Sequence, residues 1–184
     1  MILVTGGTGF LGRNMLPLLL QAGYAVRVIT RQPEAYPWLG PLPVDIFQGD
    51  ITDLPTVQRA TEGARYVIHA AGLWRFWGRA ADFEAANTLG THNVLEAARQ
   101  AGVEKLVYVS TIAVAGYPRE PILIDETCPP QPVDAYQRSK LAAEQLLLAA
   151  HQSGGLRGVI VRGGLFMDRT APMLLTSCSL KTRW

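Results

Sequence analysis

The sequence predicts an α/β fold in which a doubly wound parallel sheet carries helices on both faces. Short apolar runs rich in Val and Ile recur along the chain, as expected of strands that are covered on both sides. Segments with the apolar spacing of helices separate these runs from end to end. The 184 residues contain no internal repeat and no interdomain linker, so we expect one sizeable domain with its own core.

The first elements follow one another without interruption. Residues 1–4 form an apolar run that ends at a glycine turn, which indicates a buried strand. Residues 10–22 have helical spacing and stop at Gly23, and residues 25–30 return to an apolar run that predicts a second strand. A loop is expected at 33–43, because Pro and Gly interrupt both periods there.

The alternation then continues to the last predicted strand. The long helix expected at 82–101 is closed by Gly102, and Asp134 is suited to cap the N-terminus of the last helix. The stretch 116–133 is rich in proline and acid, so we expect an exposed loop. The remaining predicted strands are 44–48, 65–70, 105–110 and 157–162, and the remaining predicted helices are 53–61 and 134–152.

The end of the chain departs from this pattern. Residues 168–184 follow neither the helix period nor the strand period. We therefore expect a folded domain at 1–167 and an irregular tail at 168–184. The tail is either a frayed terminus or sequence unrelated to the fold, for example the product of a frameshift.

Composition excludes several classes of protein. Hydrophobic residues make up 48% of the chain and charged residues 17%, which is typical of globular rather than disordered proteins. The net charge is +2 without a basic block, so no nucleic-acid partner is expected. Cys128 and Cys178 lack metal-site spacing, so we expect no metal and a reduced, cytoplasmic setting. No signal peptide precedes Met1, and no apolar stretch approaches the ~20 residues that span a bilayer, so no membrane partner is expected.

A glycine-rich turn joins the first predicted strand to the first helix. Backbone N–H groups and a helix N-terminus meet at such a turn, and together they favour a pyrophosphate. The strand–turn–helix context is the one that this motif requires, so we predict a dinucleotide-binding, Rossmann-type domain. The alternative is a tight turn with a structural role alone. The turn reads Thr5-Gly6-Gly7-Thr8-Gly9-Phe10-Leu11-Gly12, and the predicted cofactor contacts are Gly6, Gly9, Phe10, Leu11 and Gly12.

The end of the second predicted strand indicates which dinucleotide is bound. An acid about 20 residues after the glycine turn would bind the ribose 2′-hydroxyl of NAD. This chain has Thr30-Arg31-Gln32 there, and Arg31 can pair with a 2′-phosphate. NADP is therefore the expected cofactor, with NAD as the alternative if Arg31 is only a solvated loop residue.

Two further strand ends supply candidate cofactor contacts. Asp50, with its neighbour Ile51, follows the third strand and can accept a hydrogen bond from the adenine amine, unless it only caps the next helix. The small residues Ala70, Ala71 and Gly72 follow the fourth strand and let a cofactor lie against the backbone. The preceding histidine, at position 69, is expected to be a packed structural residue rather than a catalyst.

A tyrosine and a lysine lie four residues apart on the last predicted helix, so Tyr136 and Lys140 share one face. A phenol has a pKa of ~10, which is too high for a base at neutral pH. A nearby ammonium and a nicotinamide cation would lower that pKa. We predict that Tyr136 moves a proton as acid/base and that Lys140 activates it and holds the nicotinamide ribose. The alternative is an ordinary amphipathic helix.

Two hydroxyl residues, Ser110 and Thr111, lie at the carboxyl end of the fifth predicted strand. Ligands of doubly wound sheets bind beyond these strand ends. We predict that Thr111 hydrogen-bonds and polarises the reacting oxygen, with Ser110 in support. Otherwise the two residues only cap the strand.

These motifs resemble those of the extended short-chain dehydrogenase/reductase family, in the NAD-dependent epimerase/dehydratase group, over residues 1–167. The strand-two Arg31 and the Val-Ala-Gly at 114–116 are similar to the 3β-hydroxysteroid dehydrogenase, dihydroflavonol reductase and hopanoid-associated sugar epimerase branches. The segments that carry the resemblance are the glycine turn, Gly49-Asp50, His69-Ala70-Ala71, Asn87-Thr88-Leu89-Gly90-Thr91, Ser110-Thr111 and Tyr136-Gln137-Arg138-Ser139-Lys140.

The resemblance implies hydride transfer between a nicotinamide cofactor and a hydroxyl or carbonyl substrate, such as a sugar nucleotide or a sterol-like alcohol. It adds Asn87 and Gly163 to the cofactor contacts, with Gly163 in place of the family's usual proline. It also implies a homodimer through the helices that begin near Asp82 and Asp134. The aromatic-basic loop 74–79 either lines a substrate site or covers the sheet edge.

Members of this family continue beyond the length of this chain, and their later part builds most of the substrate pocket. The resemblance therefore assigns 168–184 to the start of a missing substrate lobe. Two hypotheses follow. The chain is an NADP-preferring enzyme, or it is a truncated cofactor-binding module without turnover that serves in redox sensing or interaction.

Overall fold

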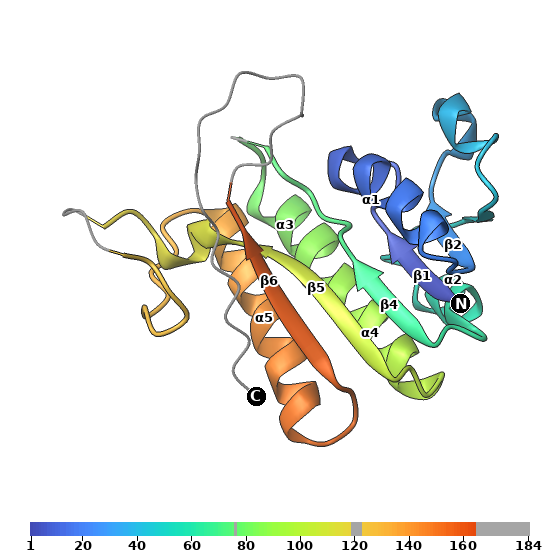
Figure 1. Cartoon of the computed structure of the whole chain (residues 1–184). Helices are drawn as coiled ribbons and strands as arrows, with labels where there is room; N and C mark the ends of the chain where they lie inside the picture. Colours follow the sequence, from blue (N-terminus) through green and yellow to red (C-terminus); the bar gives the residue numbers. More distant parts are fainter. Residues whose placement is uncertain (76, 119–122, 165–184) are drawn as a thin grey trace.

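The computed structural model describes residues 1–75, 77–118 and 123–164. Within them, six strands form one parallel sheet in the order β3-β2-β1-β4-β5-β6 (Figure 1). The order reverses between β1 and β4, which makes that point the switch where ligands of such sheets bind. The strands are β1 (Ile2–Thr5), β2 (Val26–Thr30), β3 (Asp45–Gln48), β4 (Tyr66–His69), β5 (Lys105–Thr111) and β6 (Gly158–Gly163).

Helices pack on both faces of the sheet, as predicted. Helix α1 (Phe10–Gln21) covers one face, and helices α2 (Leu54–Thr61), α4 (Gly90–Gln100) and α5 (Ala135–Gln152) lie side by side on the other (Figure 1). Each face has its own core, because successive strand residues point to opposite sides. Leu3 and Val67 belong to the larger core under α2, α4 and α5, and Val4 belongs to the smaller core under α1. The fold is therefore a Rossmann-type doubly wound sheet.

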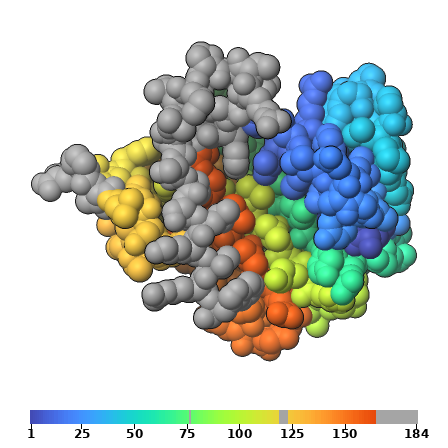
Figure 2. Space-filling view, in the orientation of Figure 1, coloured from blue at the N-terminus to red at the C-terminus, as the bar shows by residue number. Residues whose placement is uncertain are grey.

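The α1 side of the sheet is covered unevenly. On β5, Leu106 and Tyr108 are buried in the larger core, so the alternating residues Val107 and Val109 face the α1 side, where they are only half-buried. Figure 2 shows β5 and β6 reaching the surface beside α1, as yellow-green and orange atoms. None of the described helices combines the length and the apolar character that a bilayer-spanning helix needs.

The helix predicted at 82–101 differs from the expectation. It consists of α3 (Ala80–Phe83), a π-helical segment η3 (Glu84–Leu89) and then α4. The wider turn accompanies the side chain of Asn87, which reaches out of the helix to hydrogen-bond the loop after β4. Such π segments occur frequently at functional sites.

Most other boundaries agree with the sequence prediction to within one or two residues. Asp134 caps α5 as expected, because its Oδ1 accepts the backbone N–H of Gln137 at 2.7 Å. The loop predicted at 33–43 contains two short 3₁₀ turns, η1 (Pro33–Ala35) and η2 (Pro37–Leu39), which bring Leu39 into the smaller core. A third 3₁₀ turn, η4 (Ile112–Ala115), follows β5. The tail predicted at 168–184 lies outside the described residues.

Candidate functional site

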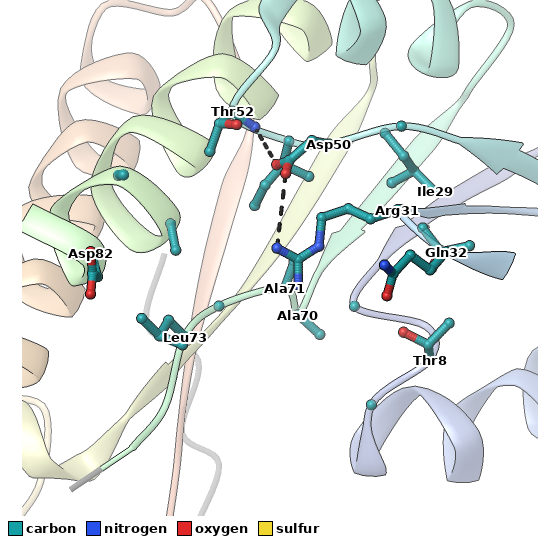
Figure 3. A pocket seen from close by; sticks show the side chains of 18 of the residues that line it. Thr8, Ile29, Arg31, Gln32, Asp50, Thr52, Ala70, Ala71, Leu73 and Asp82 are labelled. Carbon is teal, nitrogen blue, oxygen red and sulfur yellow. Dashed lines mark hydrogen bonds and ion pairs between the residues drawn. The ribbon is translucent and has the colours of Figure 1, made fainter. Parts of the chain in front are cut away.

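A cavity of about 560 Å³ opens at the carboxyl ends of the strands, where the strand order reverses (Figure 3). Its volume is in the usual range of small-molecule and cofactor sites. It is lined by the turns that follow β1, β2, β3 and β4, together with part of the helical segment that begins at α3. The lining residues are Gly6, Thr8, Gly9, Ile29, Thr30, Arg31, Gln32, Tyr36, Gly49, Asp50, Ile51, Thr52, Ala70, Ala71, Gly72, Leu73, Arg75, Asp82, Ala85 and Ala86.

The glycine turn after β1 approaches other backbone very closely. Gly6 has a φ of +71°, and a Cβ there would stand 2.5 Å from the backbone nitrogen of Ala71. A Cβ on Gly12 would stand 2.4 Å from the Cα of Gly7, so Gly12 lets α1 pack against the turn. Gly9 differs, because it lines the cavity and its Cβ would meet nothing nearer than 3.4 Å. The turn is therefore built by Gly6 and Gly12 and is open to a ligand at Gly9.

The N-terminus of α1 follows directly. Gly9 is the N-cap, and it has no side chain that could bond the first N–H groups of the helix. These N–H groups have no partner within a helix, so they remain available to an anion. Phe10 and Leu11, both predicted contacts, do not line the cavity with their side chains, and Phe10 is 47% exposed. Their backbone N–H groups, with that of Gly12, are the parts that can meet a phosphate.

The ends of β2 and β3 contribute a loose ion pair at the cavity (Figure 3). Arg31 Nη1 lies 3.9 Å from Asp50 Oδ2, and the two side chains are 77% and 41% exposed. Such an exposed pair contributes little, so the guanidinium is free to turn to another anion. Asp50 Oδ1 also accepts the backbone N–H of Thr52 at 2.9 Å, so it caps the turn, while Asp53 occupies the N-cap of α2.

The fourth strand ends in small residues that line the cavity, as predicted for Ala70, Ala71 and Gly72. The preceding His69 is fully buried, and its two ring nitrogens lie 2.6 Å from Thr5 Oγ1 and 2.9 Å from Thr91 Oγ1. Burial lowers the pKa of His69 to about 3, so the ring is neutral. His69 is the structural residue that the sequence led us to expect.

Asn87 lies beneath the loop after β4 rather than in the cavity. Its Oδ1 accepts the N–H of Leu73 at 2.7 Å, and its Nδ2 donates to the Leu73 carbonyl at 3.1 Å and to Ser139 Oγ at 2.9 Å. The amide is 1% exposed, and both N–H groups and the oxygen have partners. Asn87 thus clamps the β4 loop to α5 from the π segment, and its cofactor contact stays a prediction.

A second cavity of about 280 Å³ contains two of the three predicted catalytic residues, Thr111 and Tyr136. Arg75 lines this cavity as well as the larger one, so the two adjoin. The remaining lining residues of the smaller cavity are Trp74, Trp77, Gly78, Phe83, Ala113, Tyr117, Asp134, Ala135 and Gln137.

The pKa of Tyr136 moves in the direction opposite to the one predicted. Burial of the phenol raises its pKa, and the interaction with the Thr111 hydroxyl offsets only part of this effect. The expected lowering depended on the Lys140 ammonium and on a nicotinamide cation, and the ammonium is turned elsewhere. Lys140 Nζ donates to the carbonyl of Val109 at 2.7 Å and stands 4.2 Å from the ring centroid of Tyr108.

Lys140 is nevertheless close to the floor of the larger cavity. A Cβ on Gly72 would stand 3.8 Å from Lys140 Nζ, and Gly72 lines that cavity. Desolvation lowers the pKa of this buried lysine to about 8. Gly163, also a predicted cofactor contact, is buried beside Thr111 in the β5–β6 register and lines neither cavity.

Sequence reasoning missed several residues that line the two cavities. Thr8 lies within the glycine turn but is not among its predicted contacts, and Tyr36 and Leu73 belong to loops whose course depends on tertiary packing, so no motif identifies those two. Tyr117 lies in a predicted loop and is 73% exposed at the smaller cavity. In the aromatic-basic loop, Trp74, Arg75 and Trp77 line the smaller cavity, while Phe76 lies outside the described residues and Arg79 instead pairs with Asp82 at 2.7 Å.

The arrangement of glycine turn, switch point and Tyr-Lys helix can be compared with known proteins. The model of the NAD dependent epimerase/dehydratase family matches residues 2–166. The chain belongs to the NAD-dependent epimerase/dehydratase family. This match confirms the family expected from the motifs.

Three relatives show the range of this family. The chain is 38% identical to the 4-hydroxy-2-methyl-3-oxo-4-farnesyl-3,4-dihydroquinoline-1-oxide ketoreductase of Stigmatella aurantiaca, over 98% of this chain and 56% of that protein. It is 34% identical to the 3 beta-hydroxysteroid dehydrogenase/Delta 5→4-isomerase of Mycobacterium tuberculosis, over 88% of this chain and 45% of that protein. The solved UDP-glucose 4-epimerase of Thermus thermophilus, in complex with NAD, has a TM-score of 0.80 and 37% identity, over 88% of this chain and 54% of that one. The chain spans about half the length of the relatives it matches.

Proposed function

We propose that the chain binds a nicotinamide dinucleotide in the larger cavity and transfers hydride between it and a hydroxyl or carbonyl substrate in the smaller one. The chain would then act as an oxidoreductase or as an epimerase-type enzyme. The observation that carries the proposal is that Thr111 and Tyr136 line a cavity that shares Arg75 with the larger cavity, which the glycine turn lines. The dinucleotide, when bound, supplies or accepts the hydride.

The residues of the larger cavity suit such a ligand. Gly9 leaves open space beside the N-terminus of α1, where a pyrophosphate would meet backbone N–H groups. Ala70, Ala71 and Gly72, small residues that follow β4 beside Gly6, form the floor of the cavity. Lys140 lies under that floor, from where its ammonium can reach a ribose hydroxyl.

Tyr136 is the proposed acid/base. Because burial raises its pKa, the phenol keeps its proton at neutral pH and is ready to donate it to a carbonyl oxygen during reduction. Thr111 would hydrogen-bond the same oxygen and stabilise the negative charge that develops there. In the direction of oxidation, the phenol must first lose its proton, so that direction needs a higher pH.

We propose that NADP is preferred over NAD. The support is Arg31, whose side chain is 77% exposed at the cavity and is held by a loose 3.9 Å pair with Asp50. A guanidinium in this position can bind a 2′-phosphate through charge-assisted hydrogen bonds. The solved Thermus relative has NAD bound, so the preference is a property proposed for this chain alone.

The aromatic character of the smaller cavity supports a flat, apolar alcohol or ketone as the substrate class. Trp74, Trp77 and Tyr117 are 60%, 78% and 73% exposed there. Arg75, a basic residue of the same lining, is already paired with Asp82 at 2.8 Å, which makes a diphosphate a poorer fit. Ring-containing compounds bind such aromatic walls through stacking.

The test is the change Tyr136→Phe, which removes the hydroxyl and little else. We expect NADPH-dependent turnover of a cyclic ketone to fall by at least about a hundredfold, the contribution usual for general acid catalysis. Binding of NADPH, followed by its fluorescence, should stay within about twofold of wild type. The matched control is Tyr117→Phe, which makes the same change at the exposed rim and should retain turnover. Turnover retained in the Tyr136 variant would contradict the acid/base role.

A second candidate function, dinucleotide binding without turnover, is favoured by one observation. Lys140 Nζ is bonded to the Val109 carbonyl instead of approaching Tyr136. A redox-sensing or interaction module would bind NADPH but give no turnover with any ketone, in wild type as in the Tyr136 variant.

We also propose a homodimer in a cytoplasmic setting. The support for the dimer is apolar exposure on the helical layer of η3 and α5, where Leu89 and Leu148 are 46% and 48% exposed. The support for the compartment is the low cysteine count, with Cys128 and Cys178 as the two thiols of the chain. Light scattering on the purified chain tests the dimer, and a mass of one chain would contradict it.

A further inference from the structure

Lys140 is a buried ammonium with weak local support. It is 5% exposed, it donates a hydrogen bond to the neutral carbonyl of Val109, and it stands over the ring of Tyr108. A carbonyl dipole and an aromatic face stabilise a cation less than water does, so desolvation lowers the lysine pKa. What keeps this lysine charged must therefore come from another group.

One turn further along α5 lies a buried carboxylate, Glu144. It is 1% exposed, and its position four residues after Lys140 puts it on the same helix face. Its negative charge raises the pKa of Lys140 and opposes the effect of desolvation.

The carboxylate is held by the neighbouring strand β6. Arg162 Nε lies 3.0 Å from Glu144 Oε1, and Arg162 Nη2 lies 2.6 Å from Glu144 Oε2. This two-point geometry fixes the orientation of the carboxylate and satisfies a charge that would be costly to bury alone. Glu126 and Cys128, from the loop before α5, add to the effect of Glu144 in raising the pKa of Arg162.

The other titratable groups that face Lys140 are neutral at physiological pH. His69 of β4 is uncharged because burial lowers its pKa. Tyr108 of β5 and Tyr136 of α5 are uncharged because burial raises theirs. Among the described residues, Glu144 is thus the full negative charge that acts on the lysine, and Arg162 is paired with it.

We propose that Glu144 is a positioning residue that keeps Lys140 protonated, and that Arg162 limits how much of this negative charge Lys140 experiences. Glu144 lies four residues from Lys140 on α5, and its ion pair with Arg162 ties that helix to β6. The consequence for catalysis rests on the proposed function, in which Lys140 must be charged to bind a ribose hydroxyl of the dinucleotide. The protonation itself is measured without cofactor or substrate, so the two ideas can fail separately.

The sequence makes the measurement simple, because the chain has three lysines, Lys105, Lys140 and Lys181. Lysine labelled with ¹³C at Cε gives one NMR signal for each, and the variants Lys105→Arg and Lys181→Arg assign them. The Lys140 signal is then followed from pH 6 to pH 11 in wild type, Glu144→Gln and Arg162→Gln.

Opposite shifts are the expected result. Glu144→Gln keeps the shape but removes the charge, so the titration midpoint of Lys140 should fall by about one pH unit, a tenfold change in its protonation ratio. Arg162→Gln removes the opposing charge, so the midpoint should rise. The matched control is Glu96→Gln, which breaks the exposed ion pair with Arg99 on α4 and should leave the midpoint unchanged.

A midpoint that stays in place in both variants, or moves in the same direction in both, overturns the proposal. If Glu144→Gln does not fold, Arg162→Gln and Arg162→Lys still decide. The lysine substitution keeps the positive charge and should restore the wild-type midpoint. If the Lys140 midpoint shifts equally in Arg162→Lys, which keeps the charge but loses the bidentate geometry, and in Arg162→Gln, the role of Glu144 is structural only.

Discussion

Gly6 in the glycine turn is constrained in two ways, by its left-handed backbone conformation and by its close approach to neighbouring backbone. The destabilising effect of each constraint can be measured separately by comparing Gly6 with a second glycine. Gly6 has both a positive φ and a Cβ position that overlaps the backbone of Ala70 and Ala71. Gly63 also has a positive φ, +72°, but nothing lies within 4 Å of its Cβ position. The change Gly63→Ala therefore measures the cost of the left-handed backbone alone, and Gly6→Ala measures that cost plus the clash.

The magnitudes follow from the two contributions. An L-residue in the left-handed region lowers the free energy of unfolding by roughly 1–2 kcal/mol. Replacing glycine by alanine also lowers the entropy of the unfolded chain, which offsets about 0.4–1 kcal/mol of that loss. Overpacking adds about 1–3 kcal/mol. We expect the free energy of unfolding to drop by about 1 kcal/mol in Gly63→Ala and by about 2–4 kcal/mol in Gly6→Ala. For a domain of this size, the second loss lowers the Tm by roughly 5–15 °C.

A third substitution connects the turn to binding. Gly9 has an extended backbone and open space at its Cβ, so Gly9→Ala should cost at most about 1 kcal/mol, the usual difference between these residues at an N-cap. Its methyl group would project toward the cavity, however, and should weaken NADPH binding. Urea denaturation measures the stability of all three variants, and fluorescence titration measures their affinity. If Gly6→Ala is no less stable than Gly63→Ala, the close approach to β4 is wrong.

Three other predictions follow from the charges at the site. Arg31→Ala should weaken NADPH binding by about tenfold and leave NADH binding within about twofold, because one charge-assisted phosphate contact is lost; equal loss for both cofactors would contradict the assignment. Ketone reduction should be independent of pH up to about 8, where Lys140 loses its proton, whereas alcohol oxidation should rise with pH over the same range, because the pKa of Tyr136 is raised; a fall in reduction near neutral pH would count against this acid. The folded-state pKa of His69, about 3, lies below its ordinary 6.5, so the unfolded state takes up the proton first and stability should fall as the pH drops from 6.5 toward 3, by up to about 1.4 kcal/mol per unit. His69→Gln should remove that part of the pH dependence in urea denaturation, and an unchanged slope would argue that the ring is not held neutral.

The parts of the account that could be predicted from the sequence are those that depend on local spacing. The glycine turn and the alternation of strands and helices depend on residues that are close together in the sequence. Arg31, directly after β2, could likewise be predicted to lie at the cavity from its place in the sequence. Asp134 could be placed as an N-cap for the same reason.

The parts that could not be predicted depend on contacts between distant segments. The amide of Asn87 is engaged by Leu73 and Ser139, which are 14 and 52 residues away, and the π segment accompanies those bonds. The Lys140–Val109 bond joins groups 31 residues apart, and it decides that burial, not the ammonium, sets the direction of the Tyr136 pKa. Spacing on one helix established that Tyr136 and Lys140 share a face, but not which neighbour the ammonium would bind.

The central claim is that the cavity at the switch point binds a nicotinamide dinucleotide through the glycine turn. The most direct measurement is a fluorescence titration of the purified chain with NADPH and then NADH, in parallel with Gly9→Ala. The account predicts saturable binding with NADPH clearly tighter than NADH, and weaker binding in a Gly9 variant that remains folded. Absence of saturable binding for both dinucleotides, in a chain whose denaturation shows that it is folded, would contradict the claim.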